Sequence, residues 1–185
     1  MADGGSDTTA VCLAAALQAD RCEIYKDTKC ICTADPKLIP QAKKLPQLDY
    51  KQMMKLAKMG AKVMAAKAMQ EAEKAQLTVW VKAMDSEKEA TKISQVSYQG
   101  EQIMVSCTKK MFSPTKEILT FLKNTHHKST ENIEQYMKLI LKKNNVKEYQ
   151  WNQDEMTISL IVDKDISMDI FQQVHEQVIE KKGRE

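Results

Sequence analysis

The first 25 residues place an apolar helix directly before a short buried strand, and this order limits the possible folds more than any other feature of the chain. Residues 6–19 repeat apolar side chains at helical spacing behind Ser6, a capping candidate. Residues 22–25, Cys-Glu-Ile-Tyr, are typical of a buried strand. A long irregular stretch follows as far as Pro46. A helix, a strand and a long loop in this order predict the α/β class.

The next segments continue the alternation and end at a charged run. Helices are predicted from residue 49 to Gly60 and over residues 64–75. β-Branched and aromatic side chains at 77–81 predict a strand, and the charged residues 85–92 follow it. We therefore expect a first domain over residues 1–84, a linker over 85–101 and a second domain over 102–185.

The second domain mixes helices with paired strands. The predicted elements are a strand at 103–108, a helix after Ser113-Pro114, a helix over 130–143, strands at 146–151 and 156–162, and a helix over 168–180. This order predicts a small α+β sandwich.

The charge balance argues against a nucleic-acid partner. The formal net charge is +3, from 28 basic and 25 acidic residues. All the basic residues except Arg21 and Arg184 are lysines. Proteins that read nucleic-acid sequence rely on the planar guanidinium group, whereas scattered lysines are usually solvated surface charges. We expect no nucleic-acid binding.

The apolar and cysteine content indicates a cytoplasmic protein without a membrane span. Hydrophobic residues make up 43% of the chain, but the longest apolar runs fall far short of the roughly 20 residues that cross a bilayer. The cysteines are odd in number, and the first residues lack the basic and apolar regions of a signal peptide. We expect a reducing, cytoplasmic environment.

The residues most suggestive of a binding site are Gly4-Gly5-Ser6-Asp7-Thr8-Thr9, which lead into the first helix. Glycines allow close approach to the backbone, a helix N-terminus offers unpaired N–H groups, and three hydroxyls add donors. These are the requirements of a phosphate or carboxylate site. An ordinary helix cap explains the same residues, and the spacing matches neither a Walker loop nor a dinucleotide fingerprint.

Further segments in a fixed order resemble one family. They are Ala19-Asp20-Arg21-Cys22-Glu23-Ile24-Tyr25, then Asp27, then Thr33-Ala34-Asp35-Pro36-Lys37, then Gly60-Ala61-Lys62-Val63-Met64. Together with the glycine motif they are similar to aspartokinase over residues 3 to about 82. The resemblance implies the C-terminal half of an amino-acid-kinase (carbamate-kinase-like) fold. The family transfers the ATP γ-phosphoryl group to the side-chain carboxylate of aspartate with Mg²⁺.

The resemblance implies a set of nucleotide- and substrate-binding residues. Gly4, Gly5, Ser6, Asp7, Thr8 and Thr9 correspond to the family's motif between nucleotide and amino acid, Asp27 to its nucleotide-contacting aspartate, Lys37 to an arginine that faces the phosphates, and Lys62 to the lysine of its Gly-Ala-Lys-Val motif. Positioned cations suit phosphoryl transfer, because charge develops on the transferred group. We assign no metal ligand and no certain catalytic residue.

Several positions depart from the family pattern. Ala2-Asp3 replaces an Arg-Gly pair, and Ala65-Ala66 replaces His-Pro. Of the family's Thr-Asp-Val-Asp-Gly-Val-Tyr, residues 26–32 keep Asp27 alone among the polar positions. The family's preceding half is not found before Met1, so parallel strands would lose their usual covering on one side. We expect exposed edges and apolar patches, and therefore a homo-oligomer or a complex with a full-length aspartokinase-type subunit.

Residues 131–181 resemble the ACT regulatory module that follows the kinase domain in aspartokinases. The resemblance implies a ferredoxin-like α+β domain, with residues 103–108 as its first strand and 112–129 as an insertion. In the family, paired modules bind an end-product amino acid, which makes lysine or threonine the possible effector here. Residues 109–114 replace the usual effector turn, so a module that only dimerises is an equal alternative.

Two smaller features carry less weight. Cys30 and Cys32 lack the two-residue gap of redox and zinc motifs, which favours incidental thiols. His126-His127 falls in a polar break between predicted helices and is interpreted as exposed.

Three functions remain open at this point. The first is a regulatory or accessory subunit of aspartokinase type that keeps part of the ATP site. The second is a catalytic aspartate kinase chain whose missing half is supplied by another chain. The third is a diverged, non-catalytic scaffold.

Overall fold

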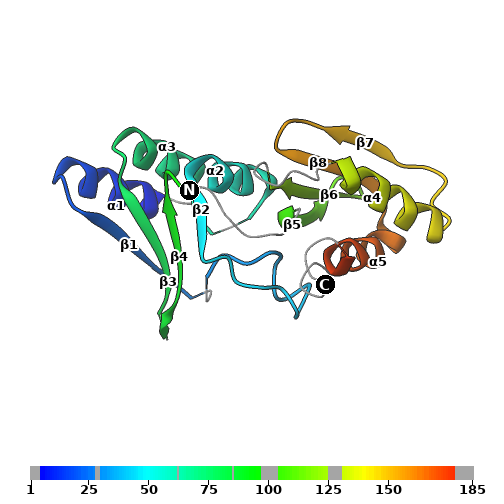
Figure 1. Cartoon of the computed structure of the whole chain (residues 1–185), viewed down its shortest axis with the longest axis horizontal. Helices are drawn as coiled ribbons and strands as arrows, with labels where there is room; N and C mark the ends of the chain where they lie inside the picture. The colour runs from blue at the N-terminus through cyan, green and yellow to red at the C-terminus, as the bar shows by residue number, and fades with distance from the viewer. Residues whose placement is uncertain are drawn as a thin grey trace. The chain divides into compact units, whose positions relative to one another are not determined.

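The chain forms two compact units in the computed structural model, which describes residues 5–27, 30–61, 63–84, 86–96, 104–124 and 131–177. The first unit comprises residues 1–32 and 43–98, and the second comprises residues 33–42 and 99–185. Each unit has its own sheet (Figure 1). Of the helices in the described ranges, none combines the length and the apolar character needed to cross a membrane.

The first unit is an α/β unit with a four-stranded sheet. Its elements are α1 (Gly5–Ala16), β1 (Arg21–Lys26), β2 (Gln47–Asp49), α2 (Tyr50–Met59), α3 (Ala66–Lys74), β3 (Thr78–Ala83) and β4 (Ser86–Ser94). The strand order is β1-β3-β4-β2, in which β1 is parallel to β3, β4 is antiparallel to β3, and β2 is parallel to β4. The residues predicted to begin a linker at 85 thus form β4 and complete this sheet.

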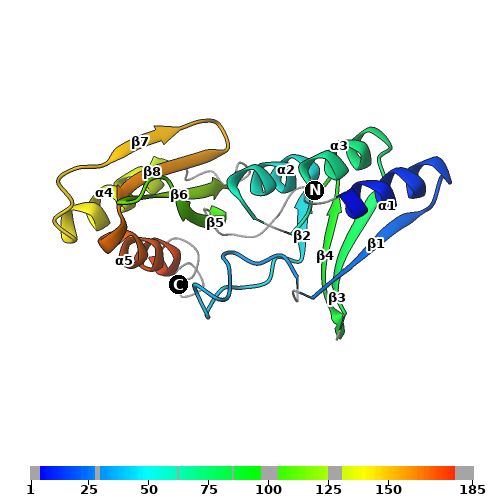
Figure 2. The same cartoon turned by 180° about the vertical axis from the view of Figure 1, so that it is seen from behind.

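The three helices of the first unit lie on one face of its sheet (Figures 1 and 2). Alternate residues of β1 and β3, such as Ile24 and Val81, point to this face and are buried. The opposite face carries charged side chains beside Tyr25 and Trp80. Glu23 pairs there with Lys82 at 2.8 Å and with Arg21 at 2.8 Å, and the Tyr25 hydroxyl donates to the Glu23 carboxylate. The charged groups of these ion pairs stay in contact with water, and Tyr25 is 52% exposed beside them.

Exposed apolar side chains also occur on α1. Leu13 is 58% exposed and Leu17, which follows the helix, is 70% exposed. Among the described residues of α1, Val11 is the apolar residue that is fully buried. One side of α1 is therefore apolar and open.

Helix α2 begins and ends where its sequence predicts. The Asp49 carboxylate accepts a hydrogen bond from the backbone N–H of Gln52 at 2.7 Å, and the Gln52 side chain accepts from the Asp49 N–H at 3.0 Å. This reciprocal pair is a capping box. At the other end Gly60 has φ of 106°, a left-handed conformation that favours glycine and closes the helix.

The capping box gives a testable contribution to stability. We expect Asp49→Ala to lower the free energy of unfolding by about 1 kcal/mol, because the Gln52 N–H in the first turn of α2 loses its carboxylate partner. Asp163→Ala is the matched control, since Asp163 precedes α5 (Lys164–His175) and makes no capping hydrogen bond to it. Urea unfolding of both variants checks the difference. Equal losses would contradict the assigned role of the box.

The second unit is an α+β sandwich. Its elements are β5 (Met104–Met111), β6 (Lys116–Lys123), α4 (Glu131–Lys143), β7 (Gln150–Gln153), β8 (Thr157–Asp163) and α5 (Lys164–His175). The sheet is antiparallel with the order β5-β6-β8-β7. This is the strand order of a ferredoxin-like unit, except that the edge strand beside β6 is β5, which comes first in the chain. The α+β class predicted for this part of the chain is thus correct.

One predicted element of this unit is wrong. The segment after Ser113-Pro114 was expected to be a helix within an insertion over 112–129, but it forms β6, a central strand of the sheet. Residues 119–123 are all buried, so the strand shows no polar–apolar alternation. A run of consecutive buried residues fits a buried strand and a buried helix equally well by periodicity, and only pairing with β5 and β8 distinguishes them.

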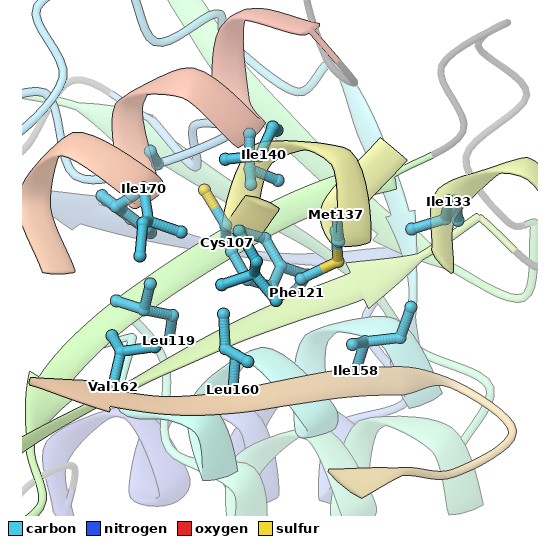
Figure 3. Packing of buried hydrophobic residues seen from close by; sticks show 14 of the residues in the cluster. Cys107, Leu119, Phe121, Ile133, Met137, Ile140, Ile158, Leu160, Val162 and Ile170 are labelled. Carbon is cyan, nitrogen blue, oxygen red and sulfur yellow. The ribbon is translucent and has the colours of Figure 1, made fainter. Parts of the chain in front are cut away.

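The core of the second unit lies between its sheet and its two helices (Figure 3). It is formed by residues of all its layers, among them Cys107, Leu119, Phe121, Ile133, Met137, Ile140, Ile158, Leu160, Val162 and Ile170. The rings of Phe121 and Phe171 lie 6.3 Å apart between centroids and are tilted by 44°. Such tilted aromatic pairs add to the stabilisation from buried area.

A short segment from early in the chain belongs to this second unit. Ala34 and Ile39 are buried in its core. The Thr33 carbonyl accepts from the Cys107 N–H at 2.8 Å, and the Thr33 hydroxyl is hydrogen-bonded to Nε2 of His175 at 2.9 Å. Residues 33–42 are therefore a structural part of the second unit.

Glu117 on β6 makes the second unit sensitive to acid. Burial alone would raise the pKa of Glu117, but hydrogen bonds from Lys109 and Ser167 and the charges of Lys109 and Lys164 outweigh it and hold that pKa below its ordinary value of 4.5. A lowered pKa in the folded state contributes stability above the unfolded pKa, and this contribution is lost as the pH falls.

We expect the free energy of unfolding to decrease from about pH 5 to pH 3, and Glu117→Gln to flatten part of this decrease. Urea titrations at a series of pH values measure it. A variant curve parallel to that of the original protein would show that Glu117 does not contribute.

Candidate functional site

The N-terminus of α1 and the carboxyl end of β1 meet in the first unit. Both oxygens of the Asp7 carboxylate lie 2.9 Å from Nζ of Lys26, the last residue of β1. Asp7 is 5% exposed and lies in the first turn of α1, where the helix dipole favours a negative charge. Strand β1 is parallel to β3, and ligands of α/β sheets bind outside the carboxyl ends of parallel strands.

The residues beside this ion pair leave room and donors for a ligand. A Cβ atom placed on Gly5 would meet no heavy atom of the described residues within 4 Å. Ser6 and Thr9 are exposed, and the Thr9 hydroxyl donates to the Gly5 carbonyl at 2.9 Å. The described residues therefore leave space at Gly5 beside a helix N-terminus, the kind of place in which phosphates and carboxylates bind.

The structure places the other predicted site residues as follows. Asp27 is exposed and directly follows Lys26, so it lies at the same end of the first unit as Asp7. Lys37 is exposed and belongs to the second unit, where its N–H donates to the Asp35 carboxylate at 2.9 Å. Gly4 and Lys62 lie outside the described residues, as does the predicted His126-His127 break.

Lys26 is the residue that sequence reasoning missed. It was treated only as a departure from the family pattern, because a hydroxyl residue stands at that position in relatives. In the structure it supplies the counter-charge for a nearly buried carboxylate. The signal was a lysine at the end of an apolar strand, where a charge requires a partner.

Comparisons with known proteins match this part of the chain. The model of the amino acid kinase family matches residues 1–83. The aspartokinase of Thermus thermophilus is 43% identical over 99 residues, which are 54% of this chain and 24% of that protein. Over these residues the chain is similar to the aspartokinase family. It spans a quarter or less of the length of the curated aspartokinases that it matches.

Solved aspartokinases share the fold of nearly the whole chain. Aspartate kinase of Clostridium acetobutylicum matches with a TM-score of 0.79 at 14% identity, over 96% of this chain and 59% of that one. E. coli aspartokinase III with lysine and aspartate gives 0.74 at 15% identity, over 96% and 56%. The same enzyme with aspartate and ADP gives 0.54 at 23% identity, over 95% and 39%. These likenesses concern the fold alone.

The chain is thus similar to aspartokinases in the motif of its first part and in its fold. The described residues hold no group of three or more His, Cys, Asp or Glu side chains suited to a metal ion. In the first unit the structure brings Lys26 to Asp7, on the same helix start as Gly5, Ser6 and Thr9, and Asp27 follows Lys26 in the chain.

Proposed function

We propose that the chain is a regulatory or accessory subunit of aspartokinase type that keeps part of a nucleotide site. The observation that supports it most is the open helix start at Gly5, beside two exposed hydroxyls. Gly5 is not required by crowding within the described residues, so the space above it is available to a ligand. A phosphate group fits the backbone N–H groups of a helix's first turn.

The ion pair sets the electrostatics of this site. Asp7 near an anion site would repel phosphates, but Lys26 neutralises it at 2.9 Å. Attraction for a phosphate then comes from the N–H groups and dipole of α1 rather than from a free lysine. This is a weaker arrangement than a cluster of free cations, and it fits nucleotide binding better than phosphoryl transfer.

Asp27 is the residue suited to a metal-bound nucleotide. Mg²⁺ is commonly held by one or two carboxylates together with substrate phosphates, and Asp27 offers an exposed carboxylate directly after Lys26, the partner of Asp7. Bound Mg²⁺ would neutralise phosphate charge. ADP is a ligand of E. coli aspartokinase III, which supports ATP with Mg²⁺ as the nucleotide here.

The second unit is the proposed regulatory part. Its ferredoxin-like sheet order and its separate core support an ACT-like module that folds around its own contacts. Lysine is a ligand of E. coli aspartokinase III, so lysine or threonine is the proposed effector.

The partner is a second copy or a full-length aspartokinase-type subunit in the cytoplasm, and the open apolar side of α1 supports such an association.

A second candidate is a catalytic chain completed by another chain. It is favoured by the retained Ser6, Asp7 and Thr9 at one helix start, which are the family's positions between nucleotide and amino acid. Formation of 4-phospho-L-aspartate from ATP and aspartate in the presence of a full-length subunit distinguishes it. A scaffold that binds neither nucleotide nor amino acid is the remaining alternative.

Calorimetric titration with Mg-ATP tests the nucleotide site. The original chain should bind, and Gly5→Ala should weaken binding by at least about tenfold, because the new methyl group occupies the space above the helix start. Replacing glycine by alanine within a helix is expected to raise the unfolding free energy by up to about 1 kcal/mol, which separates lost binding from lost folding. Failure of the original chain to bind would remove the nucleotide proposal. Equal binding of Mg-ATP by Gly5→Ala would show that the nucleotide site does not lie at the start of α1.

Thermal unfolding tests the regulatory unit. A hundredfold excess of effector over its dissociation constant should stabilise the folded chain by about 2.7 kcal/mol. Lysine and threonine are added separately, with glutamate as a control. Unchanged melting with both would exclude an amino-acid sensor and leave a module that only dimerises.

A further inference from the structure

Cys30 and Cys32 hold their sulfur atoms next to each other in the first unit. The two Sγ atoms are 3.8 Å apart. Cys32 forms an isolated bridge with Lys44, so the backbone at Cys32 itself is held against a neighbouring segment. Side chains two residues apart on an extended chain point to the same side, so the spacing that sequence analysis took as incidental puts both thiols on one face.

The residue between them fixes this arrangement. Ile31 is 2% exposed, its N–H donates to the Thr91 hydroxyl at 3.1 Å, and its carbonyl accepts from the Leu45 N–H at 2.8 Å. Both backbone groups of Ile31 are therefore held by the rest of the first unit. The thiols approach each other by rotation of their side chains, with the backbone already in place.

We propose that Cys30 and Cys32 form a reversible intrachain disulfide, which makes this segment a thiol–disulfide switch. In an extended chain their Cα atoms are about 6.6 Å apart, near the upper end of the range that a disulfide spans. A bridge at that limit is more easily reduced than a structural disulfide. It is therefore suited to forming and breaking with the redox state of its surroundings.

The oxidant is a small-molecule disulfide such as oxidised glutathione. Cys32 is half-buried and Cys30 is 5% exposed, so the Cys32 thiolate attacks first, forms a mixed disulfide and releases one glutathione thiolate. The Cys30 thiolate then attacks the sulfur of Cys32 and releases the second glutathione. The two cysteines lose two protons and two electrons in total, and one glutathione disulfide becomes two glutathione molecules.

The position of the pair gives the switch a consequence. Asp27 precedes it, and directly after Cys32 the chain passes from the first unit into the second. A ring closed around Ile31 restricts the chain between these two points. Oxidation is thus expected to stiffen the connection from the candidate nucleotide segment to the second unit.

The other thiols serve as internal references. Burial raises the pKa of Cys22 and of Cys107, and for Cys22 the charges of Asp7 and Glu23 add to the rise. Both are therefore poor sources of thiolate. Cys12 is exposed on α1 and reports that the oxidant has reacted with accessible thiols.

The experiment uses the full chain, first reduced and then incubated with oxidised glutathione. Remaining thiols are alkylated with N-ethylmaleimide and the chain is digested with trypsin. Cleavage after Lys29 and Lys37 places both cysteines in one peptide, residues 30–37. We expect this peptide to be unalkylated and lighter than its dithiol form by two hydrogens, and dithiothreitol to restore the dithiol form.

Two variants complete the test. Cys30→Ser should leave Cys32 carrying one glutathione, because no second thiol resolves the mixed disulfide. Cys12→Ser should still form the internal bridge. The proposal is overturned if the original peptide keeps two alkylated thiols, or carries glutathione without an internal bridge, once Cys12 has been modified.

Discussion

Replacing Phe121 by alanine is expected to unfold the second unit. Phe121 is fully buried at the centre of β6 and contacts Phe171 across the core. Phenylalanine-to-alanine changes in cores cost about 3–5 kcal/mol, because the lost burial is added to the cost of a cavity. Domains are stable by only about 5–15 kcal/mol, so this one change removes a large share of the total.

Phe112→Ala is the matched control for this prediction. Phe112 lies between β5 and β6 and is 56% exposed, so its loss should change the unfolding free energy by less than about 0.5 kcal/mol. Urea unfolding followed by near-ultraviolet circular dichroism measures both variants. Similar small effects for the two phenylalanines would mean that β6 does not lie at the centre of the core.

Replacing Lys26 by methionine should also destabilise the chain strongly, in this case through the first unit. Methionine keeps the apolar stem of Lys26 but leaves the Asp7 carboxylate, 5% exposed, without its counter-charge. Removing one partner of a buried ion pair costs about 3–5 kcal/mol. The Lys26 side chain is 27% exposed, so water lessens the penalty and we expect the lower end of this range.

The double variant Lys26→Met with Asp7→Asn tests whether the lost stability comes from the unpaired Asp7 charge. It removes both charges, so it should recover much of the stability that Lys26→Met loses. Lys138→Met is the control, because its pair with Glu134 is exposed on α4 and such pairs contribute about 0.3–0.5 kcal/mol. A single Lys26 variant as stable as Lys138→Met would show that Asp7 is solvated when alone.

Local sequence signals predicted the elements that are marked by capping residues or by strand-forming side chains. Helix α2 was predicted between Asp49 and Gly60, where the structure has its capping box and its left-handed glycine. β-Branched and aromatic residues likewise marked β3 at the correct place. Such elements are specified by contacts within a few residues, so the sequence alone contains the information that defines them.

Elements defined by distant contacts were not predictable in this way. The charged residues of β4 read as a linker, yet Thr91 is fully buried there and its hydroxyl donates to the Leu45 carbonyl. The apolar run of β6 read as a helix, and only its two neighbouring strands decide otherwise. Pairing partners that lie far along the chain leave no local pattern.

The candidate site was predictable only through its motif. Gly5, Ser6, Asp7 and Thr9 were expected at a helix start, and the structure places them there. The ion pair of Asp7 with Lys26 joins residues 19 positions apart and therefore depends on how α1 returns along β1. The 3.8 Å separation of the two thiols at residues 30 and 32 likewise required coordinates.

Residues 33–42 impose an order on how the chain acquires its structure. A protein emerges from the ribosome N-terminus first, so Ile39 is made long before Phe121 and Phe171, with which it shares a core. Strand β4, which completes the first sheet, is made after Ile39 and before Phe121. The first unit can fold once residue 98 has been made, but the second unit needs residues 99–185 to join 33–42, and contacts between such distant residues form slowly. Ile39 therefore has to stay unpacked until the last helix is complete, and that is the period in which a chaperone or a partner chain has most to bind.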